Sequence, residues 1–490
     1  MSAEQRIIDH LERQSNAIPD KIFVSDANQT LTYGELFQRV VKTAAGLQQH
    51  GVQTGDRVML LLEHGIDHLI SYFAAGYIGA IPVHLSINRP KGSVKQIAAI
   101  TTATYCVTDN YPEQLNDCDF QELPFRTLSG NNSPVRGSNE VAYMMFTSGT
   151  TGAPKAVMTS HTNTIATAES ILDFTQMTAD DRELISLPLA FTFGLGHIHA
   201  LIMVGGQAVL TNQRYDLEHL TTLIQQKSAT GFLASPAMLR DMVNEHREAL
   251  ICCGHYLRYM VVNCTPMEVS LTQELLDLLP GTQIIMYYGM TEASRCAYIH
   301  YNENTHRLDF TGKRTINVEL KIDNPDAGGL GEICMKGPNV MLGYWNNPEE
   351  TAKVIDADGW IRSGDWGIMD EDGYVKVIGR INDQISVDGM KCQPSEVENV
   401  ISELPWVERV TVCGITDETK FQVVGAAIIA ASNGVPEDIQ SAVREHCSKR
   451  LEAFKIPVVI ALVDQFPANE LGKVNRKELA TQLKAQLQEV

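Results

Sequence analysis

Short apolar runs alternate with longer amphipathic stretches through roughly the first 300 residues. The clearest apolar runs are Val58–Leu62, Ala80–Val83 and Val141–Phe146. Their length and composition are typical of buried strands. Between such runs the pattern takes a helical period, most clearly over Leu36–Leu47, where Thr32 and Glu35 form a capping-box pair. Strands that alternate with helix-length segments predict β-sheets covered by helices.

The stretch from Leu184 to Leu210 has no charged residue and is long enough to cross a bilayer. It also contains Pro188 and four glycines, and Gly205–Gly206 would end a helix near its C-terminal side. These breakers favour a buried helix with flanking strands, so no membrane span is predicted.

The pattern changes over Gly328–Lys336, which is typical of a turn followed by a short strand, and a small β-rich part is predicted before Gly379. After residues 381–383, short strands and helices start again. We therefore predict an α/β fold with a large N-terminal domain of helix-covered β-sheets and a small β-rich subdomain over 1–380. A small α+β C-terminal domain is predicted over 384–490.

Composition is that of an ordinary globular protein, with 44% hydrophobic and 20% charged residues, and 490 residues are too many for a single core. A net charge of −20 argues against a broad surface for nucleic acid or anionic membranes. The N-terminal residues lack the basic and apolar regions of a signal peptide. The ten cysteines include no C-x-x-C pair, so free buried thiols in a reducing cytoplasm are expected, and the histidine spacing predicts no transition-metal site.

A loop rich in glycine and hydroxyl residues follows the apolar run Tyr143–Phe146 and leads into Pro154 and Lys155. The loop consists of Thr147, Ser148, Gly149, Thr150, Thr151 and Gly152. Glycine permits close approach of the backbone, hydroxyl and N–H groups suit phosphate oxygens, and Lys155 adds a positive charge. The spacing is not that of a Walker loop, and a surface turn is the alternative. The strand, loop and lysine together favour a polyphosphate site.

Several short motifs follow this loop in a fixed order. They are Tyr287–Glu292, Gly331–Ile333 with Gly343–Trp345, Ser363–Asp365, Gly379–Arg380, Gly389 with Lys391, and Gly472–Arg476. Together with the loop, in which Ala156 replaces a usual glycine, they resemble the adenylate-forming superfamily. That superfamily includes acyl- and aryl-CoA synthetases, stand-alone adenylation domains of peptide synthetases, and luciferases. The resemblance spans nearly the whole chain and implies an enzyme that uses ATP and Mg²⁺ to join a carboxylic acid to AMP, releases pyrophosphate, and passes the acyl group to a thiol.

For the phosphates and the metal ion, the resemblance implies that the loop hydroxyls and Lys155 hold the β- and γ-phosphates. Glu292 would bind Mg²⁺, which prefers oxygen ligands, although Thr291 and Glu292 could instead begin a solvated helix. Thr291 would contact the α-phosphate. Tyr288 would stack near adenine, with core packing as the alternative.

For the ribose and the reacting groups, the resemblance implies three further residues. Asp365 would bind both ribose hydroxyls and Arg380 would also contact the ribose, with a turn residue and a surface ion pair as the alternatives. Lys473 would be the catalytic lysine that bridges the substrate carboxylate and the α-phosphate, with a solvated lysine as the alternative.

The resemblance also implies that the C-terminal domain rotates between adenylation and thioester formation about a hinge at 381–383. Asn382 stands at the hinge position, where aspartate or lysine is usual, so the charge is lost although asparagine tolerates unusual backbone angles. A face at Gly389 and Lys391 would then serve thioester formation, because glycine leaves room for a pantetheine arm.

Four residues are predicted to shape the acid pocket: Phe191, Gly194, Asn263 and Cys264. Amino-acid-activating relatives have an aspartate where Gly194 stands, and an unpaired buried ammonium is costly, so α-amino acids are disfavoured. Asn263 and Cys264 replace usual glycines, which predicts a short or compact acid. Phe191 is interpreted as a pocket wall or gate, with core packing as the alternative.

The sequence therefore predicts a cytoplasmic acid–thiol ligase that activates a small carboxylic acid with ATP and Mg²⁺. The phosphopantetheine of an acyl or peptidyl carrier protein is the preferred acceptor, because the chain is short and its pocket is altered. An acyl- or aryl-CoA synthetase, with CoA as the acceptor, is the close alternative. A luciferase-like oxygenase and a catalytically inactive nucleotide-binding regulator are the more distant alternatives.

Overall fold

The computed structural model forms two compact units. It describes residues 6–89, 91–109, 120–148, 154–213, 216–265, 267–387, 390–416, 422–431, 434–468 and 473–487. Unit 1 comprises Met1–Lys321, Cys334–Ser363 and Glu371–Val375, and unit 2 comprises Ile322–Ile333, Gly364–Asp370 and Lys376–Val490. Because the two units alternate along the chain between residues 322 and 376, the domain boundary and hinge at 381–383 stay predictions.

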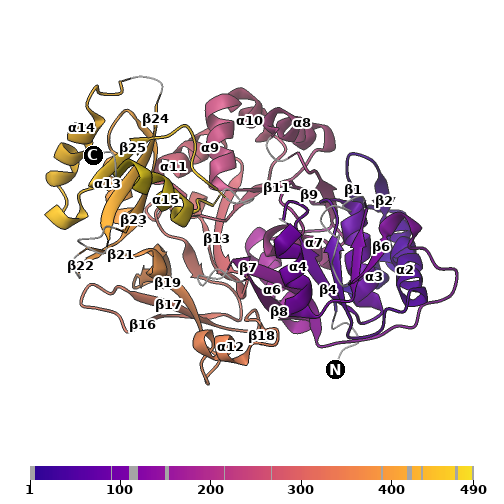
Figure 1. Cartoon of the computed structure of the whole chain (residues 1–490). Coiled ribbons are helices and arrows are strands. Elements are labelled where there is room, and N and C mark those ends of the chain that lie inside the picture. Colours follow the sequence, from indigo (N-terminus) through magenta and orange to yellow (C-terminus); the bar gives the residue numbers. More distant parts are fainter. Residues whose placement is uncertain are drawn as a thin grey trace. The chain divides into compact units, whose positions relative to one another are not determined.

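One sheet of unit 1 has the strand order β18-β8-β7-β4-β3-β5-β6. Its strands are β3 (Arg57–Leu61), β4 (Ile81–Leu85), β5 (Tyr105–Thr108), β6 (Gln121–Pro124), β7 (Val141–Ser148), β8 (Pro154–Ser160) and β18 (Gly343–Tyr344). The helices α3 (Ile66–Tyr77) and α4 (Lys91–Thr101) lie beside it, and α2 (Tyr33–Gln49) packs against α3 (Figure 1). The predicted cap of α2 is confirmed, because Thr32 Oγ1 accepts a bond from Glu35 N at 3.2 Å and Glu35 Oε2 accepts one from Thr32 N at 2.8 Å.

A second sheet of unit 1 has the order β15-β14-β13-β12-β11-β9-β10-β1-β2. Its strands are β1 (Ile22–Ser25), β2 (Thr30–Thr32), β9 (Arg182–Ile185), β10 (Gln207–Leu210), β11 (Gly231–Ala234), β12 (Tyr259–Val262), β13 (Gln283–Met290), β14 (Ala293–His300) and β15 (Gly312–Arg314). Among the residues that the structure describes, the other α-helices of unit 1 are α1 (Ile7–Ala17), α6 (His161–Thr175), α7 (Thr192–Val204), α8 (Leu217–Lys227), α9 (Pro236–Glu245), α10 (Arg247–Cys253), α11 (Val269–Leu278) and α12 (Pro348–Val354).

The uncharged stretch from Leu184 to Leu210 forms the end of β9, helix α7 and strand β10, as predicted. Gly205 ends α7 with a φ of +79°, a backbone conformation that glycine adopts without strain. In the described part of the chain, no helix is both long and apolar enough to cross a membrane.

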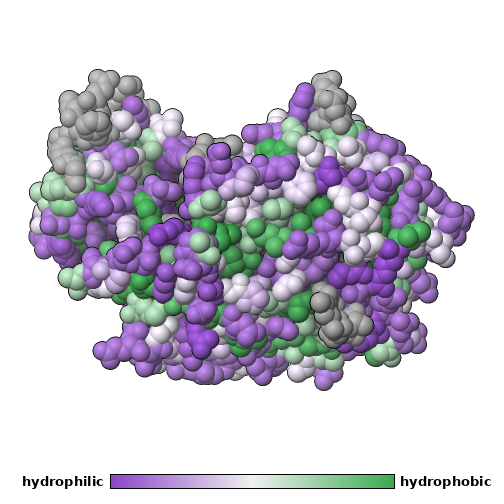
Figure 2. All heavy atoms as spheres, turned by 90° about the horizontal axis from the view of Figure 1, so that it is seen from below, coloured by the Kyte–Doolittle hydropathy of each residue, from purple (hydrophilic) through white to green (hydrophobic). Residues whose placement is uncertain are grey.

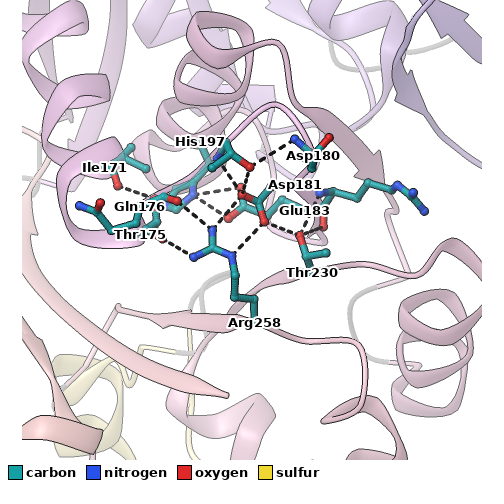
Figure 3. A network of polar contacts seen from close by, with 11 residues as sticks. Ile171, Thr175, Gln176, Asp180, Asp181, Glu183, His197, Thr230 and Arg258 are labelled. Carbon is teal, nitrogen blue, oxygen red and sulfur yellow. Dashed lines mark hydrogen bonds and ion pairs between the residues drawn. The ribbon is translucent and has the colours of Figure 1, made fainter. Parts of the chain in front are cut away.

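A polar network fastens the loop after α6 to strands β11 and β12 (Figure 3). Asp181, which is 4% exposed at its side chain, pairs with Arg258 at 2.8 Å and accepts a bond from Thr230 Oγ1 at 2.7 Å. Arg258 also donates to the carbonyl of Thr175 at 2.8 Å. Burial raises the pKa of Asp181, but the bonds from Arg258 and its other donors outweigh burial and lower the pKa below its usual value.

Four strands near the boundaries between the units are hydrogen-bonded in the order β16-β17-β19-β20. They are β16 (Glu319–Asp323), β17 (Gly331–Lys336), β19 (Ile361–Met369) and β20 (Tyr374–Arg380), which confirms the predicted β-rich part. The rest of unit 2 has a sheet β23-β24-β25 and a hairpin β21-β22. Its elements are β21 (Ile385–Val387), β22 (Met390–Cys392), β23 (Val407–Ile415), β24 (Val423–Ala430), β25 (Val459–Leu462), α13 (Pro394–Ile401), α14 (Ile439–Ser448) and α15 (Arg476–Leu487).

Nine cysteines in the described residues are in no disulfide, and all of them except Cys252 and Cys264 are buried, as the spacing of cysteines predicted. The face shown in Figure 2 is mostly hydrophilic, with separate apolar groups between the polar side chains.

Candidate active site

The predicted phosphate loop connects two antiparallel strands, β7 and β8, in which Thr147 lies opposite Lys155. Gly149, Thr150, Thr151 and Gly152 lie outside the described residues, as does Gly389, and the side chain of Ser148 is not described. The structure therefore places the two ends of the loop and not its centre.

Lys155 is fastened to the first turn of helix α12. Its Nζ lies 2.5 Å from Glu350 Oε2, and 5.0 Å from the ring centroid of Tyr344. Asn347 caps α12 by accepting a bond from Glu350 N at 3.2 Å, and Glu350 also pairs with Lys353. The hydrogen bonds from Lys155 and Lys353 lower the pKa of Glu350 to about 2, so this carboxylate is ionised at neutral pH.

Thr291 and Glu292 form the turn between β13 and β14, so the alternative of a helix start is wrong. Glu292 is only 6% exposed, and its Oε1 accepts a bond from Tyr344 Oη at 2.9 Å. Burial, followed by the charge of Glu292, raises the pKa of Tyr344, which keeps the phenol protonated as the donor. Tyr288 is half-buried near the end of β13.

One segment, residues 341–350, holds both Glu292 and Lys155. Met341 N donates to the carbonyl of Glu292 at 2.8 Å, and Trp345 N donates to the carbonyl of Ala156 at 2.8 Å, next to Lys155. Tyr344 belongs to the predicted motif Gly343–Trp345 but had no predicted role, and no local pattern marked Glu350 as a partner of Lys155. Segment 341–350 thus fixes a buried carboxylate and a lysine at the two positions that the resemblance assigns to metal and phosphate.

The two predicted pocket residues after β12 make contacts with each other and with β13. Asn263 Nδ2 donates to the carbonyl of Tyr287 at 3.1 Å, and Asn263 Oδ1 accepts a bond from Cys264 N. Both ends of this amide therefore bond to the backbone. Cys264 has a φ of +94°, a conformation that glycine adopts readily and cysteine does not.

The other two predicted pocket residues lie at the start of α7. Phe191 is the half-buried residue before the first turn, and it is absent from the buried core. A Cβ on Gly194 would lie 2.8 Å from the carbonyl oxygen of Leu187, so no aspartate fits there without movement. Arg295, a fully buried residue that the sequence analysis missed, donates to the carbonyl of Phe193 at 2.7 Å and so fastens this turn to β14.

Three predicted residues come together in unit 2. Asp365 lies within β19 and is 4% exposed, so the alternative of a turn residue is wrong. Arg380 Nε lies 2.8 Å from Asp365 Oδ1. Arg380 thus forms an ion pair, which was the alternative to its predicted contact with the ribose. Lys473 lies in the same unit, and desolvation and the charge of Arg380 lower its pKa, whereas the charge of Asp365 raises it.

The two remaining predicted residues of unit 2 are exposed. Asn382 lies in a short 3-10 helix, Ile381–Asp383, and Lys391 lies in β22 opposite Ser386.

Comparison with protein families and with known proteins shows a consistent likeness. A family model described as AMP-binding enzyme matches residues 11–345, and one described as AMP-binding enzyme C-terminal domain matches residues 396–473. The 2-succinylbenzoate–CoA ligase of Geobacillus kaustophilus is 30% identical, and the alignment covers 96% of this chain and 96% of that protein. Feruloyl-CoA synthase of an Amycolatopsis species is 29% identical, with 95% and 97% covered.

Solved structures show the same likeness. The o-succinylbenzoate CoA synthetase of Bacillus subtilis, in complex with its acyl-adenylate intermediate, has a TM-score of 0.85 and 26% identity, and the match covers 96% of this chain and 97% of that one. The same synthetase in complex with ATP and a magnesium ion gives a TM-score of 0.84 at 26% identity, with 96% and 98% covered. These matches confirm the predicted α/β fold and the resemblance carried by the motifs.

Proposed function

We propose a specific reaction for this chain, which belongs to the family of AMP-binding enzymes and is an adenylating acid–thiol ligase. The relatives are named as CoA ligases and synthases, and this favours the acyl- or aryl-CoA synthetase over the carrier-loading enzyme that the sequence analysis preferred. The proposed enzyme joins a small carboxylic acid to CoA with ATP and Mg²⁺.

The proposed chemistry has two steps. A carboxylate oxygen of the acid attacks the α-phosphorus of ATP, the bond from that phosphorus to the bridging oxygen breaks, and pyrophosphate leaves. The sulfur of CoA, having lost its proton, then attacks the acyl carbon, and AMP leaves with the electrons of the broken carbon–oxygen bond. The first step brings two anions together, so it depends on positioned cations.

The observation that carries this proposal is that segment 341–350 holds both Glu292, which accepts a bond from Tyr344, and Lys155, which pairs with Glu350. Lys155 and the hydroxyl of Thr147 would hold the β- and γ-phosphates. Glu292 fits Mg²⁺ because it is a buried carboxylate, and Mg²⁺ commonly takes one or two carboxylates together with phosphates and waters. When bound, Mg²⁺ would offset negative charge on the phosphates.

The residues of unit 2 would serve the ribose and the reacting groups. Asp365, held by Arg380, would accept bonds from both ribose hydroxyls. Lys473 would bridge the acid and the α-phosphate during adenylation. Gly389 and Lys391 would serve the second step, in which CoA takes the acyl group.

The acid is proposed to be short or compact. Cys264 stands where the superfamily usually has glycine and adds a side chain there. Asn263 fills a second such position and adds volume there, with one N–H and the oxygen of its amide already bonded to the backbone.

Product analysis tests this function. The chain is incubated with ATP, Mg²⁺, CoA and a panel of short, aryl and long-chain acids, and parallel reactions replace CoA with a phosphopantetheinylated carrier protein. We expect acyl-CoA together with AMP from a short or compact acid. Loading of the carrier alone would favour the carrier-loading enzyme, and ADP in place of AMP would contradict adenylation.

A further inference from the structure

The Lys155–Glu350 ion pair lies at the proposed phosphate site and is largely enclosed by the protein. The side chain of Lys155 is 14% exposed and that of Glu350 is 23% exposed, and the pair is closed at 2.5 Å. Enclosed ion pairs are screened less by water and salt than exposed ones. The Glu350 carboxylate therefore competes for the Lys155 ammonium with any other anion that approaches it.

The phosphates of ATP need this ammonium, if the proposed function holds. A lysine ammonium has three donors and no acceptor, and Glu350 occupies one of these donors in the structure. A phosphate beside an ionised Glu350 meets a like charge, which opposes binding. Polyphosphate and Glu350 are thus alternative partners of Lys155.

Helix α12 provides a second cation for Glu350. Lys353 lies one turn further along the helix, pairs with the other carboxylate oxygen of Glu350, and is 67% exposed. If Lys155 turns to a phosphate, Lys353 still neutralises Glu350. The exchange of partners therefore leaves no isolated charge in a partly buried place.

We infer that Glu350 is an internal anion that occupies Lys155 in the nucleotide-free enzyme, is displaced by the phosphates of MgATP, and lowers the affinity for both MgATP and pyrophosphate. This inference rests on the proposed ATP-dependent function. Glu350 acts through Lys155 and touches no reacting atom, so it is a positioning residue. Its return to Lys155 also favours the departure of pyrophosphate after adenylation.

Titration calorimetry on the full chain, with magnesium pyrophosphate and with MgATP as separate ligands, tests the inference. Glu350→Gln removes the competing charge and keeps the shape, so both ligands should bind about tenfold more tightly, as expected for the loss of one charge-assisted bond that must be broken. Glu349→Gln is the matched control, because it removes the same charge from the exposed neighbouring residue of the same turn. Its affinities should stay within about twofold of the wild type.

A second variant provides an independent test, because its affinity for pyrophosphate should change in the opposite direction to that of Glu350→Gln. Lys353→Gln removes one of the two lysines that pair with Glu350 and leaves the pair with Lys155. Displacement of Glu350 from Lys155 would then leave its charge without Lys353, so pyrophosphate should bind a few-fold more weakly. Glu350→Asp keeps the charge and should stay closer to the wild type than Glu350→Gln does.

The outcomes separate the inference from the function on which it rests. If the wild type binds neither MgATP nor pyrophosphate, the proposed function fails and the inference fails with it. If the wild type binds both, and a folded Glu350→Gln binds them equally or more weakly, the competition is absent and only the inference is overturned. If Glu350→Gln does not fold, unchanged or tighter binding by Lys353→Gln overturns the inference.

Discussion

At the scale of single residues, Cys264, which is proposed to line the acid pocket, has a strained backbone. Its φ of +94° lies where a side chain with a Cβ is rarely found. Such positions cost about 1–3 kcal/mol and concentrate at functional sites. The superfamily pattern has glycine here, and this chain instead has a cysteine, which adds a thiol beside Asn263.

Cys264→Gly should therefore stabilise the protein. We expect the free energy of unfolding to rise by about 1 kcal/mol, because glycine adopts this φ without strain although it loses more entropy on folding. Urea unfolding followed by circular dichroism measures the change. Cys264→Ala is the control, since it keeps the Cβ and with it the strain. A Cys264→Gly variant that is no more stable than Cys264→Ala would show that the position is not strained.

At the scale of elements, a buried polar cluster joins α3, β4 and α7 inside unit 1. His68 Nε2 lies 2.9 Å from His84 Nδ1, and Tyr72 Oη lies 3.0 Å from His199 Nε2. All three imidazoles are almost fully buried. Burial lowers the pKa of His68 to about 4 and that of His199 to about 3, so both are neutral in the folded protein at neutral pH.

This cluster predicts a loss of stability in mild acid. The unfolded chain takes up protons near a histidine pKa of about 6.5, whereas the folded chain does so only near 4 or 3. The contribution of these histidines to the free energy of unfolding is therefore complete above about pH 6.5. It falls as the pH decreases towards their pKa values in the folded protein. We expect the free energy of unfolding to drop by several kcal/mol between about pH 7 and about pH 5, because each of these histidines contributes about 1.4 kcal/mol of loss for each pH unit below about 6.5.

Urea unfolding at a series of pH values measures this loss. His199→Gln, which can still accept a bond from Tyr72, should reduce the slope, whereas His255→Gln at the surface should leave it unchanged. A slope that is the same in all three proteins would contradict the account. Asp181 does not interfere, because its lowered pKa confines its contribution to pH values below about 4.

Helices and strands were predictable where they depend on the local sequence. The apolar runs became β3, β4 and β7, and the cap at Thr32 began α2, because these features depend on neighbouring residues. The partners of the site residues could not be found in this way. Tyr344 is 52 positions from Glu292, and Glu350 is 195 positions from Lys155, so only the folded chain brings each pair together.

At the scale of the whole molecule, adenylation and thioester formation are proposed to use different residues. Lys473 is proposed to act in adenylation, and Gly389 and Lys391 are proposed to act in thioester formation. The two steps can be measured apart, because adenylation alone supports the exchange of pyrophosphate into ATP whereas thioester formation also requires CoA.

Gly389→Trp should spare the first step and block the second. A large side chain at Gly389 would occupy the proposed path of the pantetheine arm, which only thioester formation uses. Acid-dependent pyrophosphate exchange should stay within about threefold of the wild type while acyl-CoA formation falls by about a hundredfold, the size of loss that misplacement of a reactant produces. Gly389→Ala is the control for the loss of glycine itself. Parallel collapse of both activities would assign Gly389 to folding.

The most direct test of the central claim is acid-dependent exchange of labelled pyrophosphate into ATP, compared between the wild type and Lys473→Ala across the acid panel. We expect the wild type to exchange only when a short or compact acid is present. Lys473→Ala should bind MgATP and yet exchange at least about a hundredfold more slowly, as for the loss of one preorganised charge in the transition state. A wild type that shows no acid-dependent exchange, or a Lys473→Ala variant within about threefold of it, would contradict the account.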